Sequence, residues 1–134
     1  MNEKIIIYFD GSSIGNPGPS AAAYIIEKEN GEVLFEEGIF IGESTNNVSE
    51  YKALIYALNK AKEMSIKEIE LRTDSELVIN HLLGKYRVKS DKIIPLFKEA
   101  KELLKNFKWE IKKVSRKEMK RVDQLAFATA KSGR

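Results

Sequence analysis

An apolar run of strand-forming residues, 5–9 (Ile-Ile-Ile-Tyr-Phe), ends abruptly at Asp10. Residues 11–19 follow as a turn-rich connection of glycine, proline and small polar side chains. A run of this kind is typical of a strand buried in the middle of a sheet. The sequence therefore predicts a central strand with a carboxylate at its exposed end. Functional side chains commonly lie at such positions.

Two further strands are predicted at residues 21–27 and 33–41, joined by a turn at Asn30-Gly31, so the first three strands form an antiparallel meander. After Gly42 the apolar period changes to that of a helix over residues 47–64. A strand at 68–72, a short helix at 75–83, an amphipathic helix at 93–104, a strand at 107–114 and a terminal helix at 120–130 complete the pattern.

This order predicts an α/β fold with one mixed five-stranded sheet, three antiparallel strands followed by two parallel ones, and helices on both faces. A chain of 134 residues supports one substantial core, so residues 1–134 are expected to form a single domain.

The composition excludes several classes of site. Without cysteine there are no disulfides, thiolate nucleophiles or cysteine-bound zinc, and one histidine excludes a His-rich metal site. The net charge of +3 is compatible with a polyanionic partner but does not establish one. Neither a signal-peptide pattern nor a membrane-spanning apolar run is present, so we expect a cytoplasmic protein. Nothing in the sequence demands an oligomer, and a monomer is expected.

Four acidic residues can be placed at the ends of predicted elements. Asp10 and Asp74 end strands, whereas Glu50 and Asp123 fall in the opening turns of helices, where negative charge is tolerated. Brought together, such carboxylates repel one another unless divalent cations lie between them. The alternative is that each is only a turn or capping residue.

Four motifs in this order resemble ribonuclease H type 1, in the form without a basic protrusion: residues 9–19, 45–53, 73–75 and 122–126. The resemblance implies a ribonuclease H-like fold and hydrolysis of the RNA strand of RNA–DNA hybrids by two Mg²⁺ ions, with Mn²⁺ as an alternative, leaving 5′-phosphate and 3′-hydroxyl ends. It implies that the catalytic, metal-binding residues are Asp10, Glu50, Asp74 and Asp123.

The resemblance also implies a set of substrate contacts. Backbone near the first carboxylate lies close to the scissile strand, asparagines contact the minor groove, and a phosphate of the DNA strand is bound. The matching residues are Gly11, Ser12, Asn16, Thr45, Asn46, Asn47 and Ser90. Amide groups suit this role because a 2′-hydroxyl both donates and accepts hydrogen bonds. Asparagines at these positions are equally compatible with turns and helix caps.

The chain departs from the family pattern in two places. The segment 84–91 is short, with Lys85, Arg87 and Lys89 as the remaining phosphate contacts or as a solvated loop. The loop before the last acidic residue lacks the usual histidine and the usual Asn-Glu pair, for which Glu118 and Arg121 are candidate substitutes. These departures keep two rival functions open: a nuclease that cleaves double-stranded RNA, and a non-catalytic hybrid-binding module.

Overall fold

A computed structural model describes residues 3–133. Its single sheet contains β1 (Lys4–Ser13), β2 (Gly18–Lys28), β3 (Val33–Ser44), β4 (Glu68–Thr73) and β5 (Lys108–Lys113) in the spatial order β3-β2-β1-β4-β5. The first three strands are antiparallel, and β4 and β5 run parallel to β1. The predicted mixed sheet is therefore confirmed.

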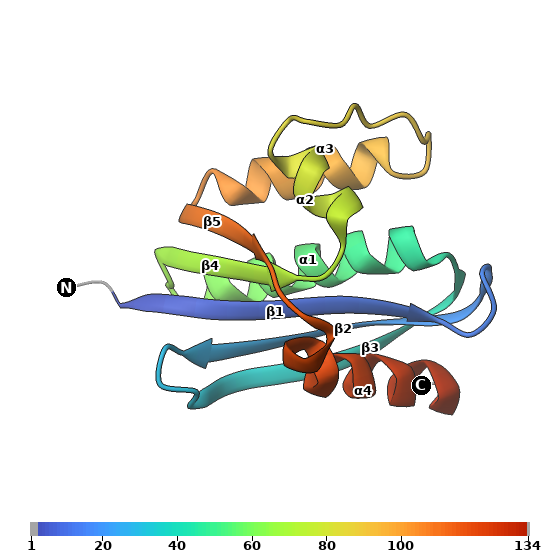
Figure 1. Ribbon diagram of the computed structural model, residues 1–134, viewed down its shortest axis with the longest axis horizontal. Helices are drawn as coiled ribbons and strands as arrows, with labels where there is room; N and C mark the ends of the chain where they lie inside the picture. The colour runs from blue at the N-terminus through green and yellow to red at the C-terminus, as the bar shows by residue number, and fades with distance from the viewer. Residues whose placement is uncertain (1–2, 134) are drawn as a thin grey trace.

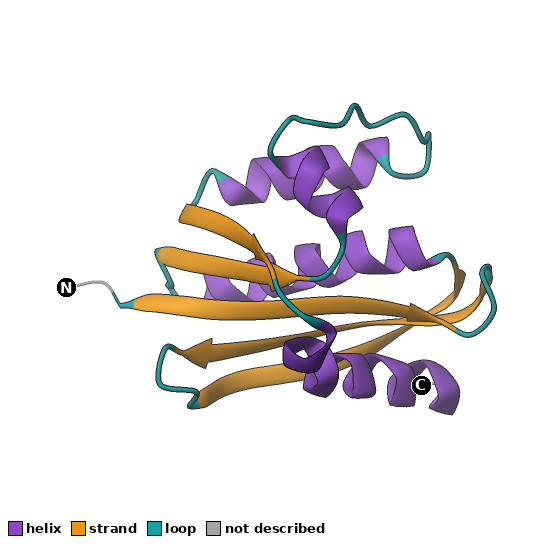
Figure 2. Ribbon diagram, in the orientation of Figure 1, coloured by secondary structure: helices purple, strands orange, loops and turns teal. Residues whose placement is uncertain are grey.

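Four helices cover the sheet: α1 (Asn46–Glu63), α2 (Glu76–Leu82), α3 (Ile94–Leu104) and α4 (Arg116–Ser132). Helix α1 packs on β1 and β2, and α3 packs on α1, whereas α4 crosses β1, β2 and β3 on the opposite face (Figures 1 and 2). Among residues 3–133, none of the helices is long and apolar enough to cross a membrane.

The two cores follow from the alternation of side chains along the central strands. On β2, Ala22, Tyr24 and Ile26 face the main core under α1, whereas Ala23 and Ile25 face a smaller core under α4. The small core is completed from α4 by Met119, Val122 and Ala126. A strand buried on both faces is a nearly continuous apolar run, which explains why residues 21–26 show no alternation of apolar and polar side chains.

Several predicted boundaries are wrong, and β3, predicted to end at residue 41, continues to Ser44. The turn-rich connection predicted over residues 11–19 is confined to residues 14–17, because β1 and β2 continue as strands beyond Asp10 and back to Gly18. Backbone pairing of Ser13 with Ser20 supplies hydrogen bonds that outweigh the local preference for a turn. The last helix begins at Arg116 rather than at residue 120, with Ser115 as its N-cap.

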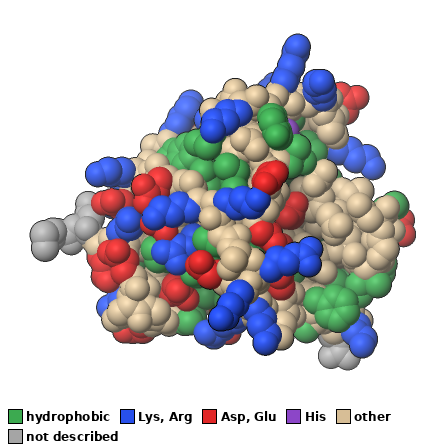
Figure 3. All heavy atoms as spheres, in the orientation of Figure 1, with side chains coloured by type: hydrophobic (Ala, Val, Ile, Leu, Met, Phe, Trp, Pro, Cys, Tyr) green, Lys and Arg blue, Asp and Glu red, His purple; other side chains and the backbone are tan. Residues whose placement is uncertain are grey.

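Beside α4, the same face of the sheet is covered by an ionic network and not by a helix. Glu70 is only 1% exposed and pairs with Arg72 of its own strand β4, Lys4 of β1 and Lys112 of β5. Acidic and basic side chains are accordingly interspersed on the face shown in Figure 3. These ion pairs hold the pKa of Glu70 at about 2 despite its burial.

Candidate active site

Asp10 lies inside β1 and not at its end, because the strand continues for three more residues. It pairs with Ala23 of β2, and its side chain is 7% exposed. On its other side, the parallel register that joins Tyr8 to Arg72 brings Asp10 alongside Asp74, the first residue after β4. Strand pairing therefore fixes Asp10 on the β2 side, whereas the pairing of β1 with β4 ends two residues earlier, at Tyr8.

Glu50 reaches this point from α1. It is the fifth residue of that helix, so the predicted place in the opening turn is wrong, and the first turn carries no acidic residue. The helix approaches β1 closely at Gly11, where a Cβ atom would lie 2.4 Å from the backbone nitrogen of Glu50. Glycine is needed here because any side chain would push α1 off the strand.

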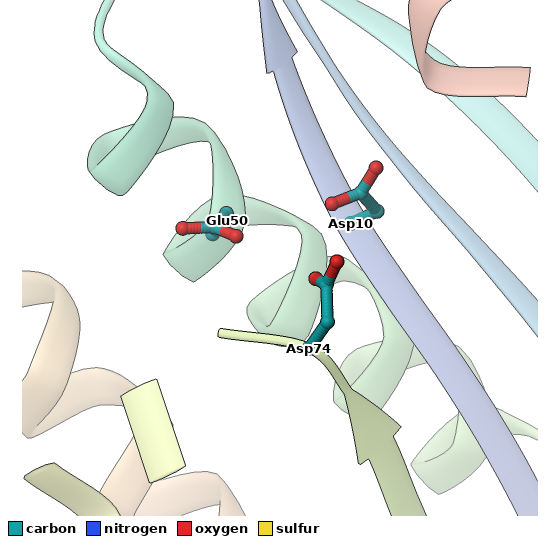
Figure 4. Close-up of side chains that lie close together, drawn as sticks. All are labelled: Asp10, Glu50 and Asp74. Atoms are coloured by element: carbon teal, nitrogen blue, oxygen red, sulfur yellow. The ribbon is translucent and has the colours of Figure 1, made fainter. Parts of the chain in front are cut away.

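The three carboxylates converge. Asp10, Glu50 and Asp74 each offer an oxygen, and these oxygens lie within 4.8 Å of one another (Figure 4). Three carboxylate oxygens at this spacing are the kind of donor set that hard divalent cations prefer. The residues present therefore fit a divalent metal site.

Asp123 joins the cluster from the opposite face of the sheet. It is the eighth residue of α4, so its predicted place in an opening turn is also wrong. Its carboxyl group is near enough to Asp10 to raise the pKa of that residue. All four acidic residues line one depression, here called the carboxylate pocket, together with Gly11, Ser12, Asn46, Arg116 and Phe127.

Burial and mutual repulsion disturb the ionisation of this cluster. Burial, followed by the neighbouring Asp123, raises the pKa of Asp10 far above its ordinary value. Burial and the nearby Asp74 raise the pKa of Glu50 to about 7. Ser75 offsets this effect at Glu50 only in part, and a cation placed among the oxygens would stabilise the ionised carboxylates. The electrostatics thus agree with the donor geometry.

The predicted substrate-contacting residues surround the start of α1. Thr45 is the N-cap, and its hydroxyl accepts a hydrogen bond from the backbone of Val48 at 3.3 Å. Asn16 accepts a hydrogen bond from the backbone of Asn46 at 3.1 Å, which ties the β1–β2 turn to the helix. Asn46 is the first helical residue, exposed and part of the carboxylate pocket, and it is not the cap.

A second depression, the basic groove, has a volume of about 510 Å³. It brings together most of the remaining predicted contacts, from the β1–β2 turn, α1 and the α2–α3 loop. It is lined by Asn16, Thr45, Asn47, Val48, Leu77, His81, Arg87, Lys89, Ser90, Lys92 and Ile93. Lys85 is exposed on the same loop but does not line this groove.

The two candidate substitutes on α4 point elsewhere. Glu118 lies in the first turn of the helix, 3.7 Å from the guanidinium of Arg72, and Arg121 pairs with Glu36 of β3 at 2.9 Å. Neither lines the carboxylate pocket. Their proposed roles at the reacting centre stay predictions.

Two residues of the carboxylate pocket were missed by sequence reasoning, Arg116 and Phe127. Arg116 belongs to a run of basic residues that is usually a solvated face, and the helix was expected to begin only at residue 120. Once the helix begins at residue 116, the spacings of seven and four residues place Arg116, Asp123 and Phe127 on one side of α4. That spacing was the available signal.

Known proteins share this arrangement. A family described as "Reverse transcriptase-like" matches residues 8–129. Ribonuclease HI of Halobacterium salinarum is 40% identical over 124 residues, 92% of this chain. This chain spans only 62% of the length of that curated relative.

Solved structures agree. The crystal structure of RNase H1 from Halobacterium salinarum NRC-1 superposes with a TM-score of 0.91 at 39% identity, covering 98% of this chain and 99% of that one. LC11-RNase H1, solved in complex with an RNA/DNA hybrid, gives a TM-score of 0.88 at 35% identity over 92% of this chain and 94% of its own. With the same strand order, the same helices and this degree of identity over nearly all of its length, the chain belongs to the type 1 ribonuclease H family.

Proposed function

We propose that this protein is an endoribonuclease that hydrolyses the RNA strand of RNA–DNA hybrids with the help of divalent cations, leaving 5′-phosphate and 3′-hydroxyl ends. The observation that carries the proposal is the convergence of Asp10, Glu50 and Asp74 within 4.8 Å, with Asp123 beside Asp10. A related RNase H1 structure contains an RNA/DNA hybrid, which supports the same substrate class here.

The four carboxylates would hold two cations, Mg²⁺ or Mn²⁺. Asp10 would serve both ions, Glu50 and Asp74 would serve one, and Asp123 the other. When bound, the cations supply Lewis acidity that activates a water and stabilises the leaving oxygen at phosphorus. Because this chemistry needs no side-chain nucleophile, it suits a chain that has no cysteine.

The surrounding residues orient the substrate. The cation of Arg116 lies in the same pocket as the carboxylates and is suited to hold a phosphate next to them. The exposed amide of Asn46, in the same pocket, can donate to and accept from a 2′-hydroxyl. Gly11 and Ser12 line the same pocket. Together these groups favour an RNA strand at the reacting centre.

The basic groove is suited to the DNA strand. Thr45 and Ser90 supply hydroxyl groups, and Arg87 and Lys89 supply positive charge, within one depression that shares the start of α1 with the carboxylate pocket. Two neighbouring depressions, one acidic and one basic, can accommodate two strands of different chemistry.

The decisive experiment is a panel of labelled duplexes. The protein is incubated with RNA–DNA hybrid, double-stranded RNA and double-stranded DNA, each with Mg²⁺, with Mn²⁺ and with EDTA. We expect cleavage of the hybrid in both metals and none in EDTA, and we expect products with 5′-phosphate ends.

Other outcomes would contradict parts of the proposal. Cleavage of double-stranded RNA in preference to the hybrid would support the rival nuclease. Tight hybrid binding without cleavage in either metal would support a binding module. Cleavage that persists in EDTA would reject the metal-dependent mechanism itself.

A further inference from the structure

Phe127 is a large apolar residue on the exposed side of α4. The helix buries Met119, Val122, Ala126 and Ala130 against the sheet, but the side chain of Phe127 is 53% exposed. It is the most exposed of the large hydrophobic side chains in residues 3–133. A single exposed apolar side chain is common on protein surfaces, so the exposure of this ring by itself implies no function.

The position of the ring is more informative than its exposure. Phe127 lines the carboxylate pocket, one helical turn beyond Asp123, while Arg116 lines it from the other direction along α4. With a rise of about 1.5 Å per residue, Phe127 lies about 6 Å along the helix axis from Asp123, and Arg116 about 10 Å the other way. A strand whose phosphate lies at the carboxylates is therefore flanked by a cation on one side and an apolar ring on the other.

The chemistry of the ring selects what it can touch. The other groups of the pocket are charged, amide, hydroxyl or backbone groups, whereas the phenyl ring neither donates nor accepts hydrogen bonds. The bases of a duplex are stacked in its interior, so the apolar surface that its backbone presents is the C–H face of the sugars. An aromatic ring gains affinity by covering such a face.

We propose that Phe127 forms an apolar subsite, which packs against the sugar of a nucleotide next to the scissile phosphate. The proposal rests on the hybrid-cleaving function proposed above. Such a contact buries apolar area without neutralising a phosphate, so it adds affinity that does not depend on salt. Contacts from arginine and lysine differ in this respect, because their affinity falls steeply as salt rises.

The test uses steady-state cleavage of a labelled RNA–DNA hybrid in Mg²⁺ at several salt concentrations. Phe127→Ala is expected to raise KM about five- to tenfold while kcat stays within about twofold. The slope of log KM against log salt should not change. Phe127→Leu, which keeps an apolar side chain, should recover most of the loss. Met64→Ala, another exposed apolar residue at the far end of α1, serves as the matched control and should behave like the wild type.

The possible failures are distinguishable. If the wild-type protein cleaves no hybrid, the proposed function falls and the subsite with it. If the wild type cleaves and Phe127→Ala has an unchanged KM, the subsite is rejected and the function stands. A fall in kcat alone, or a shallower salt slope, would also reject an apolar sugar contact. Because the ring is exposed, the melting temperature of the variant should equal that of the wild type.

Discussion

At the scale of single residues, the fold keeps the four carboxylates close together although they repel one another. Asp10 is almost fully buried, next to other carboxylates, and its ionised form is disfavoured. The folded state therefore binds a proton at Asp10 more strongly than the unfolded chain does, and ionisation at neutral pH lowers the free energy of unfolding. This is the stability cost that active sites commonly carry.

The first prediction follows from that cost. Asp10→Asn should abolish cleavage and, in EDTA at pH 7, increase the free energy of unfolding by at least about 1 kcal/mol. The gain should shrink as the pH falls toward the ordinary carboxylate pKa of 3.8, because Asp10 is then protonated in both states. Thermal unfolding over pH 4–8 measures this. A variant that is less stable at pH 7 would contradict the predicted sign.

The second prediction compares two glycines. At Gly11 a Cβ atom would meet the backbone of Glu50, and at Gly38 it would lie 2.2 Å from the hydroxyl oxygen of Thr129 on α4. Alanine at either position should cost about 1–3 kcal/mol of stability. Only Gly11→Ala should also lower kcat, about ten- to hundredfold, because it displaces Glu50. Activity per folded molecule, assayed well below the melting temperature, separates the two. Equal kcat values would show that Glu50 tolerates the shift.

At the scale of elements, a hydrogen bond joins helices α1 and α2 next to the site. The hydroxyl of Tyr51, the residue after Glu50, lies 2.7 Å from Nδ1 of His81 on α2, and His81 is 6% exposed. Phe97 of α3 packs edge-on against the same imidazole. The histidine therefore joins three helices, and its burial lowers its pKa.

A pH dependence follows. Because the pKa of His81 is lowered in the folded state, the unfolded chain binds more protons as the pH falls below about 6.5, and the free energy of unfolding decreases. His81→Asn keeps an acceptor for Tyr51 but does not titrate, so its melting temperature should decline less between pH 7 and pH 5. Parallel curves for the two proteins would mean that burial does not affect this histidine.

The elements also show what the sequence can and cannot predict. The apolar run at 5–9 and the alternation along 68–72 predicted β1 and β4, and the helical crossover before β4 predicted that it runs parallel to β1, as observed. The start of α4 was missed although a capping signature was present, Ser115 with Glu118 three residues later, where the Ser115 hydroxyl accepts from the Glu118 backbone. Local sequence patterns could not predict that Asp123 approaches Asp10, because this depends on where α4 packs across the sheet.

At the scale of the whole molecule, charge is distributed rather than concentrated. The net charge is only +3, and acidic and basic side chains are mixed over much of the face in Figure 3. In the basic groove, by contrast, Arg87, Lys89 and Lys92 gather from one loop. Binding of a polyanion should depend on that groove and not on the general charge. A single domain, a monomeric state and a cytoplasmic location stay predictions.

This distribution predicts the salt dependence of hybrid binding. Arg87→Ala and Lys89→Ala should each weaken binding and make the slope of log K against log salt shallower by about 0.9 per lost phosphate contact. Lys105→Ala removes the same charge just after α3, where Lys105 pairs with Glu102, and should change neither quantity. Fluorescence anisotropy in Ca²⁺ measures this. Equal effects from all three variants would indicate a response to net charge alone.

Strand β1 continues for three residues past Asp10. Because Asp10 pairs with Ala23 and the pairing of β1 with β2 continues to Ser13 and Ser20, the carboxylate cannot be released by the fraying of a loop. The amide hydrogens around Asp10 should exchange with solvent only when the sheet itself opens. On heating, the protein should then lose its catalytic geometry and its fold in one cooperative step, with no intact but inactive form populated beforehand.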